Sequence, residues 1–280
     1  MPNQILFKQN SPELVKLLRA STVAYYKAKL GEIKITYFLI ILAFVYPISY
    51  LIVQDENVKL TLFGCSFLLT VLTQLFANTF KNNTSKGAIF KEEFDTILFK
   101  LPWKSTLKKP DYSEVSKFSL QYKGKEIKDW YSTNLSSAIP HNISVAVLQH
   151  SNTSWDIELR VQYRRWLTGF LIAYSILLWV VLVSNNADGQ IIFSIYFSIL
   201  SFYTHFIVLI RGHSSAIHKR KAISEHLDSI IISKKEISIE ELRDIQYEIY
   251  ISRQESAKVP NFFFLWYKKQ LNRMTEDYIE

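Results

Sequence analysis

The chain has 280 residues, of which 49% are hydrophobic, and its 33 lysines and arginines outnumber its 25 aspartates and glutamates. A single cysteine, Cys65, excludes an intramolecular disulfide framework and a cysteine-based zinc site. Seven glycines and seven prolines are too few for a turn-rich β-fold, so the composition favours long helices, and the net charge of +8 weakly favours acidic partners.

Residues 1–34 are predicted to form a helical arm. Ser11 is a favourable N-cap residue, and Pro12 is favourable in the first helical turn. The negative charge of Glu13 interacts favourably with the positive end of the helix dipole. Leucines then recur at helical spacing, and we expect this helix to run to about Gly31 and to lead into an apolar segment.

Residues 35–80 are predicted to form a first transmembrane hairpin. The stretches 35–54 and 60–80 hold 20 and 21 residues without a charged side chain, and a helix of roughly 20 residues crosses the hydrocarbon of a bilayer. Pro47 lies inside the first span, where it removes one backbone hydrogen bond. The second span carries a polar stripe: Ser66, Thr70, Thr73, Gln74 and Asn78.

The middle segment, 81–165, is the least periodic part. Residues 81–98 suit a helix continuing beyond the second span, and Leu101-Pro102-Trp103 ends it. A restart is predicted at Pro110, and residues 155–165 form a charged helix that leads into the third span. No alternating apolar pattern is long enough to require a sheet.

Residues 166–210 are predicted to form a second hairpin, with charge-free spans at 166–187 and 189–210. Only one of the 33 lysines and arginines, Lys59, lies in the two short connections, against Asp55, Glu56 and Asp188. The positive-inside rule therefore places both termini and the long segments in the cytosol. The predicted fold is an all-α membrane protein, with four transmembrane helices in two antiparallel hairpins and a mostly helical cytosolic domain.

The fourth span carries a second polar stripe at steps of four, three and four: Ser194, Ser198, Ser201 and His205. Polar groups facing lipid are costly, so both stripes should face protein or water. Two interpretations stay open. The hydroxyl groups can pack helices together, or they can line a hydrated path through the membrane.

The tail, 211–280, is predicted to be a cytosolic helical segment. Ser238 and Glu241 form a capping box for a helix that ends near Ser256. After Pro260, an aromatic block from Phe262 to Tyr267 either anchors in the membrane interface or packs on other helices. The cations that follow the fourth span, Arg211 to Lys221, suit a positive-inside anchor or a site for an anionic ligand.

Motifs for catalysis and metal binding are absent from the sequence. It holds no P-loop, no dinucleotide-binding glycine motif, no nucleophile elbow and no zinc-protease motif. Cys65 lies within a span, where a packing role is the simpler reading. We therefore expect no enzyme, no metal and no catalytic residues.

Short stretches around the four spans form a recognisable series along the chain. Near the N-terminus these are Gln9–Leu14 and Tyr25–Lys29. In the middle they are Glu93-Phe94-Asp95, Leu101-Pro102-Trp103, Lys128-Asp129-Trp130-Tyr131 and Trp155-Asp156. In the tail they are Leu242–Gln246, Arg253 and Val259-Pro260. Together these stretches resemble the SMODS-associated four-transmembrane pore-forming effectors, a bacterial family linked to cyclic-oligonucleotide anti-phage signalling (CBASS). Lys104 and Asn261 depart from the family pattern, so those two positions carry no assigned role.

The resemblance implies an effector that senses a cyclic nucleotide made by a partner nucleotidyltransferase and permeabilises the bacterial inner membrane, causing growth arrest or death of the infected cell. Its expected partners are the lipid bilayer, that nucleotide and further copies of the chain, without direct nucleic acid binding. A non-conducting sensor or scaffold that recruits a partner is the alternative. Arginines near aromatic residues are the candidate phosphate ligands: Arg160, Arg164, Arg165, Arg243 and Arg253.

Overall fold

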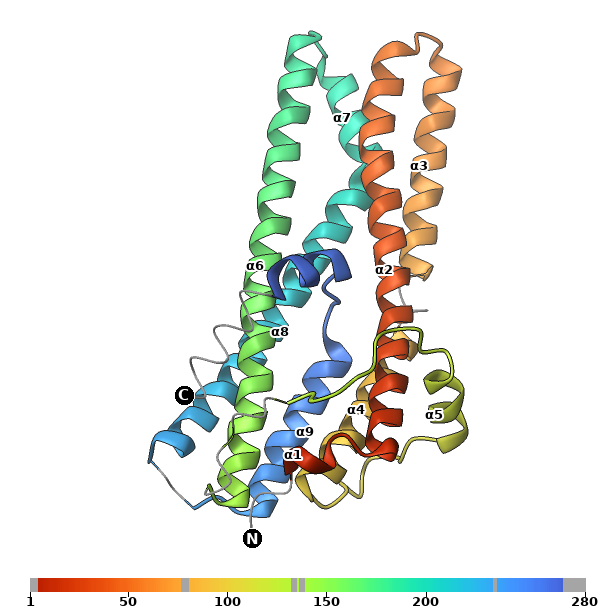
Figure 1. The fold of residues 1–280 in the computed structure, drawn as a ribbon. Helices are drawn as coiled ribbons and strands as arrows, with labels where there is room; N and C mark the ends of the chain where they lie inside the picture. The colour runs from red at the N-terminus through yellow and green to blue at the C-terminus, as the bar shows by residue number, and fades with distance from the viewer. Residues whose placement is uncertain (1–4, 77–80, 132–134, 136–138, 234–235, 269–280) are drawn as a thin grey trace.

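In the computed structural model, every regular element among the described residues, 5–76, 81–131, 135, 139–233 and 236–268, is helical. Figure 1 shows an elongated bundle in which long helices run from a wide lower end to a narrow upper end. The prediction of an all-α fold is confirmed for this part of the chain.

The N-terminal half contributes five helices. α1 (Ile5–Lys8) is one turn, and α2 (Pro12–Ile52) then runs unbroken through Gly31 and Pro47 into the first apolar stretch. Ser11 occupies the predicted N-cap, although its side chain makes no capping hydrogen bond. α3 (Glu56–Phe76) returns beside α2, and α4 (Lys81–Phe99) and α5 (Tyr112–Ser119) follow at the lower end.

The C-terminal half is built on two long helices. α6 (His141–Ser184) begins well before the predicted charged helix at 155–165 and continues through the third apolar stretch. α7 (Gly189–Ser198) and α8 (Leu200–Ser233) meet at Ile199 with a bend of 53°. Ser238 is the N-cap of α9 (Ile239–Glu255). Its side chain accepts a hydrogen bond from the Glu241 amide at 3.1 Å, which confirms the predicted cap.

Two helices, α2 and α6, are long and apolar enough to cross a membrane, and the bent pair α7–α8 makes a third if it counts as one span. The predicted second span corresponds to α3, and its last residues, 77–80, lie outside the described part. Along these helices large apolar side chains are exposed, among them Ile41, Ile48, Leu68, Ile176 and Val208. Such an apolar surface suits lipid and not water. The apolar helices and their exposed surface therefore indicate a membrane protein.

Hydrophobic packing divides into two clusters. One, around Leu14, Phe94 and Leu242, joins α2, α4, α5, α6, α8 and α9 at the lower end. The other, around Leu39, Leu167 and Phe202, joins α2, α6, α7 and α8 along the apolar stretches. Between the two levels α2 and α4 approach closely at Gly87, where a Cβ atom would lie 2.9 Å from the Tyr25 ring. The polar groups that fill the space between the clusters form the candidate site.

Candidate functional site

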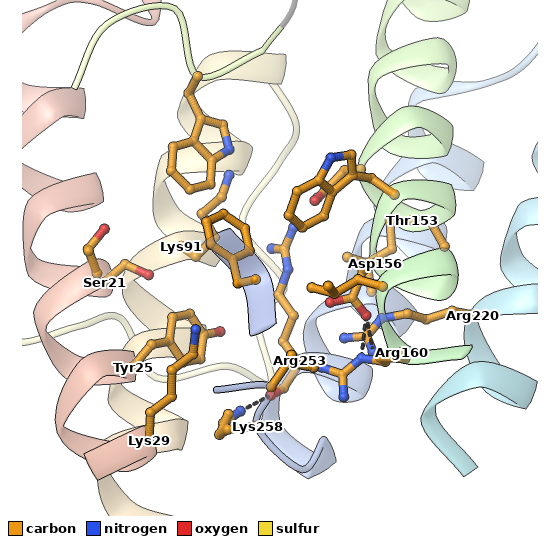
Figure 2. Close-up of a pocket in the computed structure, with 18 of the residues that line it drawn as sticks. Ser21, Tyr25, Lys29, Lys91, Thr153, Asp156, Arg160, Arg220, Arg253 and Lys258 are labelled. Carbon is orange, nitrogen blue, oxygen red and sulfur yellow. Dashed lines mark hydrogen bonds and ion pairs between the residues drawn. The ribbon is translucent and has the colours of Figure 1, made fainter. Parts of the chain in front are cut away.

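A cavity of about 250 Å³ lies between α2, α4, α6, α8 and α9 (Figure 2). We call it the basic cavity, because six cationic side chains line it: Lys29, Lys91, Arg160, Arg220, Arg253 and Lys258. Each of these cations comes from a different helix or from the segment after α9. The cavity therefore exists only once all five helices have packed.

Asp156 holds two of the arginines in place. Its carboxylate accepts a hydrogen bond from Arg160 Nε one turn along α6 and forms an ion pair with Arg220 Nη1 of α8 at 2.6 Å. Burial by itself would raise the pKa of Asp156, but the charges of Arg160 and Arg220 hold it well below its usual range. The carboxylate thus stays ionised and fixes both guanidinium groups at the cavity wall (Figure 2).

Arg160 also connects α6 to the segment after α9 by a hydrogen bond. Its Nη1 donates to the carbonyl oxygen of Ala257 at 2.7 Å and to Nδ1 of His213 at 3.2 Å. His213 is fully buried, and burial together with the charge of Arg160 lowers its pKa to about 3. The imidazole is therefore neutral and accepts from Arg160, so it adds no charge to the cavity.

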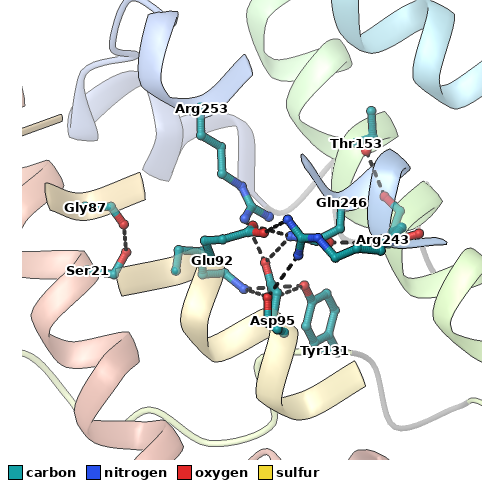
Figure 3. Close-up of polar contacts among 12 residues, drawn as sticks. Ser21, Gly87, Glu92, Asp95, Tyr131, Thr153, Arg243, Gln246 and Arg253 are labelled. Carbon is teal, nitrogen blue, oxygen red and sulfur yellow. Dashed lines mark hydrogen bonds and ion pairs between the residues drawn. The ribbon is translucent and has the colours of Figure 1, made fainter. Parts of the chain in front are cut away.

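A second polar network lies beneath the cavity, between α4 and α9 (Figure 3). Asp95, which is fully buried, accepts from Lys91 at 2.5 Å, from the Tyr131 hydroxyl at 2.7 Å and from Arg253 Nη1 at 2.7 Å. Although burial opposes ionisation, Lys91 and Arg253 leave the pKa of Asp95 below its ordinary value. Arg253 Nη2 is buried without a hydrogen-bond partner, so one edge of this guanidinium is left unsatisfied.

The three lysines of the cavity have lowered pKa values. Burial, reinforced by the charge of Arg160, lowers the pKa of Lys29 to about 8 and that of Lys258 to about 7. Burial likewise lowers the pKa of Lys91 to about 8. An anion entering the cavity would favour the protonated form of all three lysines, so its binding is coupled to proton uptake.

Aromatic side chains complete the wall: Tyr25, Trp130, Trp155 and Phe264. The Trp155 and Phe264 rings lie 5.3 Å apart, Lys91 Nζ lies 5.2 Å from the Trp130 ring centre, and Lys258 Nζ lies 4.9 Å from that of Tyr25. Nucleobases stack on such rings, while guanidinium and ammonium groups bind phosphate.

The charges in and beside the cavity are unbalanced. Among the described residues the carboxylates next to the six cations are Asp95, Asp156, Glu32, which accepts from the Lys258 amide at 3.1 Å, and Glu92, which is paired with Arg243. With Arg243 included, cations exceed carboxylates by three. An anionic ligand would relieve this excess, and phosphates flanked by aromatic bases would match the charge and the aromatic side chains of the lining.

Of the five arginines predicted to bind the ligand, Arg160 and Arg253 line the basic cavity. Arg243 lies in the network beneath it, paired with Glu92 at 2.6 Å and donating to Thr96. Arg164 donates to Ser214 at 3.3 Å, and Arg165 is exposed; neither lines the cavity.

Sequence reasoning did not identify Lys29, Lys91 and Lys258, and it placed Arg220 only within a basic cluster. One available signal was the i,i+4 spacing of Lys91 with Asp95 and of Asp156 with Arg160, which forms ion pairs on a helix. That spacing does not reveal whether a pair is exposed or buried.

Several of the residues that carried the resemblance lie in or next to this site. Trp130, Trp155 and Asp156 line the cavity, and Asp95 and Gln246 belong to the network beneath it, where Gln246 donates to Glu92 at 2.8 Å. Further away, Glu93 accepts from Tyr112, the Trp103 indole donates to Leu107, and Asp129 accepts from Asn10. Pro260 precedes a helical segment at 261–268.

The polar stripes lie in the apolar half. Ser66, Ser198 and Ser201 are buried, and the hydroxyl groups of Ser66, Thr70, Thr73 and Ser198 donate to carbonyl oxygens of their own helices. His205 Nε2 lies 2.9 Å from Thr36 Oγ1 of α2, and Ser194 is half-buried. Asn78 and the side chain of Gln74 lie outside the described residues. The bend at Ile199 separates Ser194 and Ser198 from Ser201 and His205, so the predicted single stripe is divided between two helix axes.

Within the part of the chain that the structure describes, no group of three His, Cys, Asp or Glu residues could hold a metal ion.

Comparison with known proteins links this chain to a family of bacterial effectors. The family model of the SMODS-associating 4TM effector domain matches residues 3–280. A probable CBASS effector molecule of Bacillus cereus strain VD146 is 27% identical over 290 residues, which cover 95% of this chain and 93% of that protein. No solved structure matches the chain. Because the family model covers almost its whole length, the chain belongs to the SMODS-associating 4TM effector domain family.

Proposed function

We propose that this protein is an effector of CBASS anti-phage defence that a cyclic nucleotide activates by binding in the basic cavity, after which the protein permeabilises the inner membrane. The basic cavity is the observation that carries the proposal. It combines an excess of cations with aromatic side chains, and three helices that form it, α2, α6 and α8, lead towards the apolar half.

The proposed topology has four spans, 35–54, 60–80, 166–187 and 189–210, with both termini in the cytosol. The distribution of lysine and arginine supports it, because the short connections hold Lys59 alone against three carboxylates. In this orientation the basic cavity opens on the cytosolic side, where a partner nucleotidyltransferase would release its product.

The size of the cavity suggests how binding could be transmitted. A volume of about 250 Å³ is smaller than the roughly 300–1,000 Å³ of pockets that enclose drug-sized ligands. A cyclic di- or trinucleotide would therefore have to part the helices. Since α2 and α6 are continuous from the cavity into the apolar half, such a displacement would reach the spans.

The proposed conducting path involves the polar stripes on α3, α7 and α8. In a single chain Ser66, Ser198 and Ser201 are buried, so these hydroxyl groups would meet water only after the helices rearrange or several copies assemble. Four spans provide too little wall for a wide pore, and a ring of subunits around a symmetry axis would supply more.

The same burial is the observation that favours the alternative, a sensor that does not conduct and instead recruits a partner. Release of a dye from liposomes containing the purified protein separates the two functions. With cyclic di-AMP, cyclic di-GMP and cyclic tri-AMP added in turn, we expect one of them to release the dye. A nucleotide that binds without any release would refute permeabilisation and support the sensor.

Binding of the nucleotide should weaken between pH 7 and pH 9. Lys29, Lys91 and Lys258 have lowered pKa values of about 7 to 8, so each must take up a proton to meet a phosphate in alkaline solution. The affinity should fall by up to about tenfold per pH unit for each such proton. Calorimetric titrations at pH 6.5, 7.5 and 9 measure this slope.

A Lys29→Arg variant provides the control, because a guanidinium stays protonated throughout this range. In this variant the fall of the logarithm of the affinity with pH should be smaller by the contribution of one proton. An affinity that does not change with pH would argue against ligand contact with these lysines.

A further inference from the structure

The helical segment 261–268 has two different faces. On the inner face, Phe263 is 2% exposed, and its ring lies 5.0 Å from Tyr163 and 6.5 Å from Trp166 of α6. Phe264 packs against Trp155 and lines the basic cavity. Lys29 Nζ donates to Asn261 Oδ1 at 3.0 Å, so the segment is held against α2 as well.

The outer face is apolar and uncovered. Phe262 is 50% exposed, Leu265 67% and Trp266 71%. Three large apolar side chains together on a short helix form a patch that would be costly in water. The two interpretations of this aromatic block, a membrane anchor or a packed helix, thus correspond to its two faces.

The position of the segment along α6 sets its depth. Trp166 is the first residue of the 22-residue charge-free stretch and directly follows Arg164 and Arg165. Phe262 and Phe263 both pack against Trp166 (ring centres 6.4 and 6.5 Å apart). Figure 1 shows the segment, in dark blue, beside α6 and above α9, between α6 and α2. If α6 crosses the bilayer, the segment lies where hydrocarbon meets headgroups.

We propose that the outer face of residues 261–268, formed by Phe262, Leu265 and Trp266, inserts into the lipid–water interface on the side of the basic cavity. The occupant of this surface is lipid and not a protein, because the patch is continuous with Trp166, 42% exposed at the start of a helix that can cross a membrane. Tryptophan and its aromatic neighbours favour that depth. The segment then joins two surfaces, lipid outside and the ligand cavity inside.

The test uses the full chain in nanodiscs of phosphatidylethanolamine and phosphatidylglycerol, without any nucleotide. In a Cys65→Ser background, Leu265→Cys is labelled with the environment-sensitive fluorophore NBD. The matched control is Glu248→Cys, at an exposed position on α9. We expect emission from position 265 to shift to the blue and about twofold quenching by lipids with a nitroxide near the headgroup, with neither effect at position 248.

Two results would overturn the proposal. Emission at position 265 equal to that at position 248 would mean that the outer face lies in water. A blue shift without quenching by nitroxide lipids would mean that protein covers it. Because no nucleotide is present, failure here leaves the proposed ligand cavity untouched, and failure of nucleotide binding leaves the anchoring of the segment untouched.

Discussion

Replacing Lys29 and Arg253 together by glutamine should weaken binding of the activating nucleotide about 100-fold and abolish depolarisation of cells that produce it. Each charge-assisted hydrogen bond to a phosphate contributes about 1.5 kcal/mol or more, and each 1.4 kcal/mol is tenfold in affinity. The two side chains line the cavity from α2 and α9. Glutamine keeps most of the length of both, and Asp95 retains Lys91, Tyr131 and Gln246 when Arg253 is removed.

The control removes the same two charges outside the cavity. Arg164→Gln combined with Arg165→Gln changes the net charge equally, but neither residue lines the site. In this variant, the nucleotide affinity measured by calorimetry and the depolarisation reported by a membrane-potential dye should therefore both stay close to those of the unmodified protein. If the two double variants lose affinity alike, binding depends on overall charge and the basic cavity is not the site.

Asp95→Asn should lower the free energy of unfolding by about 3–5 kcal/mol, because it leaves buried cations without their carboxylate. Asp95 is fully buried and joins Lys91, Tyr131 and Arg253 between α4 and α9. Urea unfolding of the detergent-solubilised protein, followed by tryptophan fluorescence, measures the loss. Since the pKa of Asp95 is lowered in the folded state, its stabilisation is present above the ordinary pKa of a carboxyl and lost as the pH falls below it. The variant should lack this part of the acid sensitivity.

Asp244→Asn is the matched control on α9. Asp244 pairs with Lys104 at 2.6 Å, but its side chain is 69% exposed, and surface pairs contribute about 0–1 kcal/mol. A loss for Asp95→Asn no larger than the loss for this variant would show that the buried network does not hold α4 to α9.

The proposed ligand cavity and the buried network around Asp95 share a residue. Arg253 belongs to both, since one edge of its guanidinium contacts Asp95 and the rest faces the cavity. Arg160 similarly joins Asp156, His213 and the backbone of Ala257. A phosphate that attracts either arginine would pull on α4, α6, α8 or the tail.

Much of the architecture could be predicted from the sequence. A charge-free run of about 20 residues has few alternatives to a membrane helix, and the capping box at Ser238 depends on residues only three apart. Both signals are local, because each depends only on residues that lie close together in the sequence. The departures from prediction arose where local signals compete with packing: α2 continued through Gly31, and the fourth apolar stretch bent at Ile199.

The sequence by itself determined the helical class, the apolar stretches, the charge asymmetry and the family resemblance, because each depends on residue type along a short or continuous stretch. Only the tertiary structure decided which cations line the basic cavity. Lys29 and Lys258 are 229 positions apart, and nothing in their neighbours separates them from the exposed lysines elsewhere. In the packed bundle both lysines line a common cavity, where burial lowers their pKa values. Burial depends on how the helices pack and therefore cannot be read from the neighbouring residues.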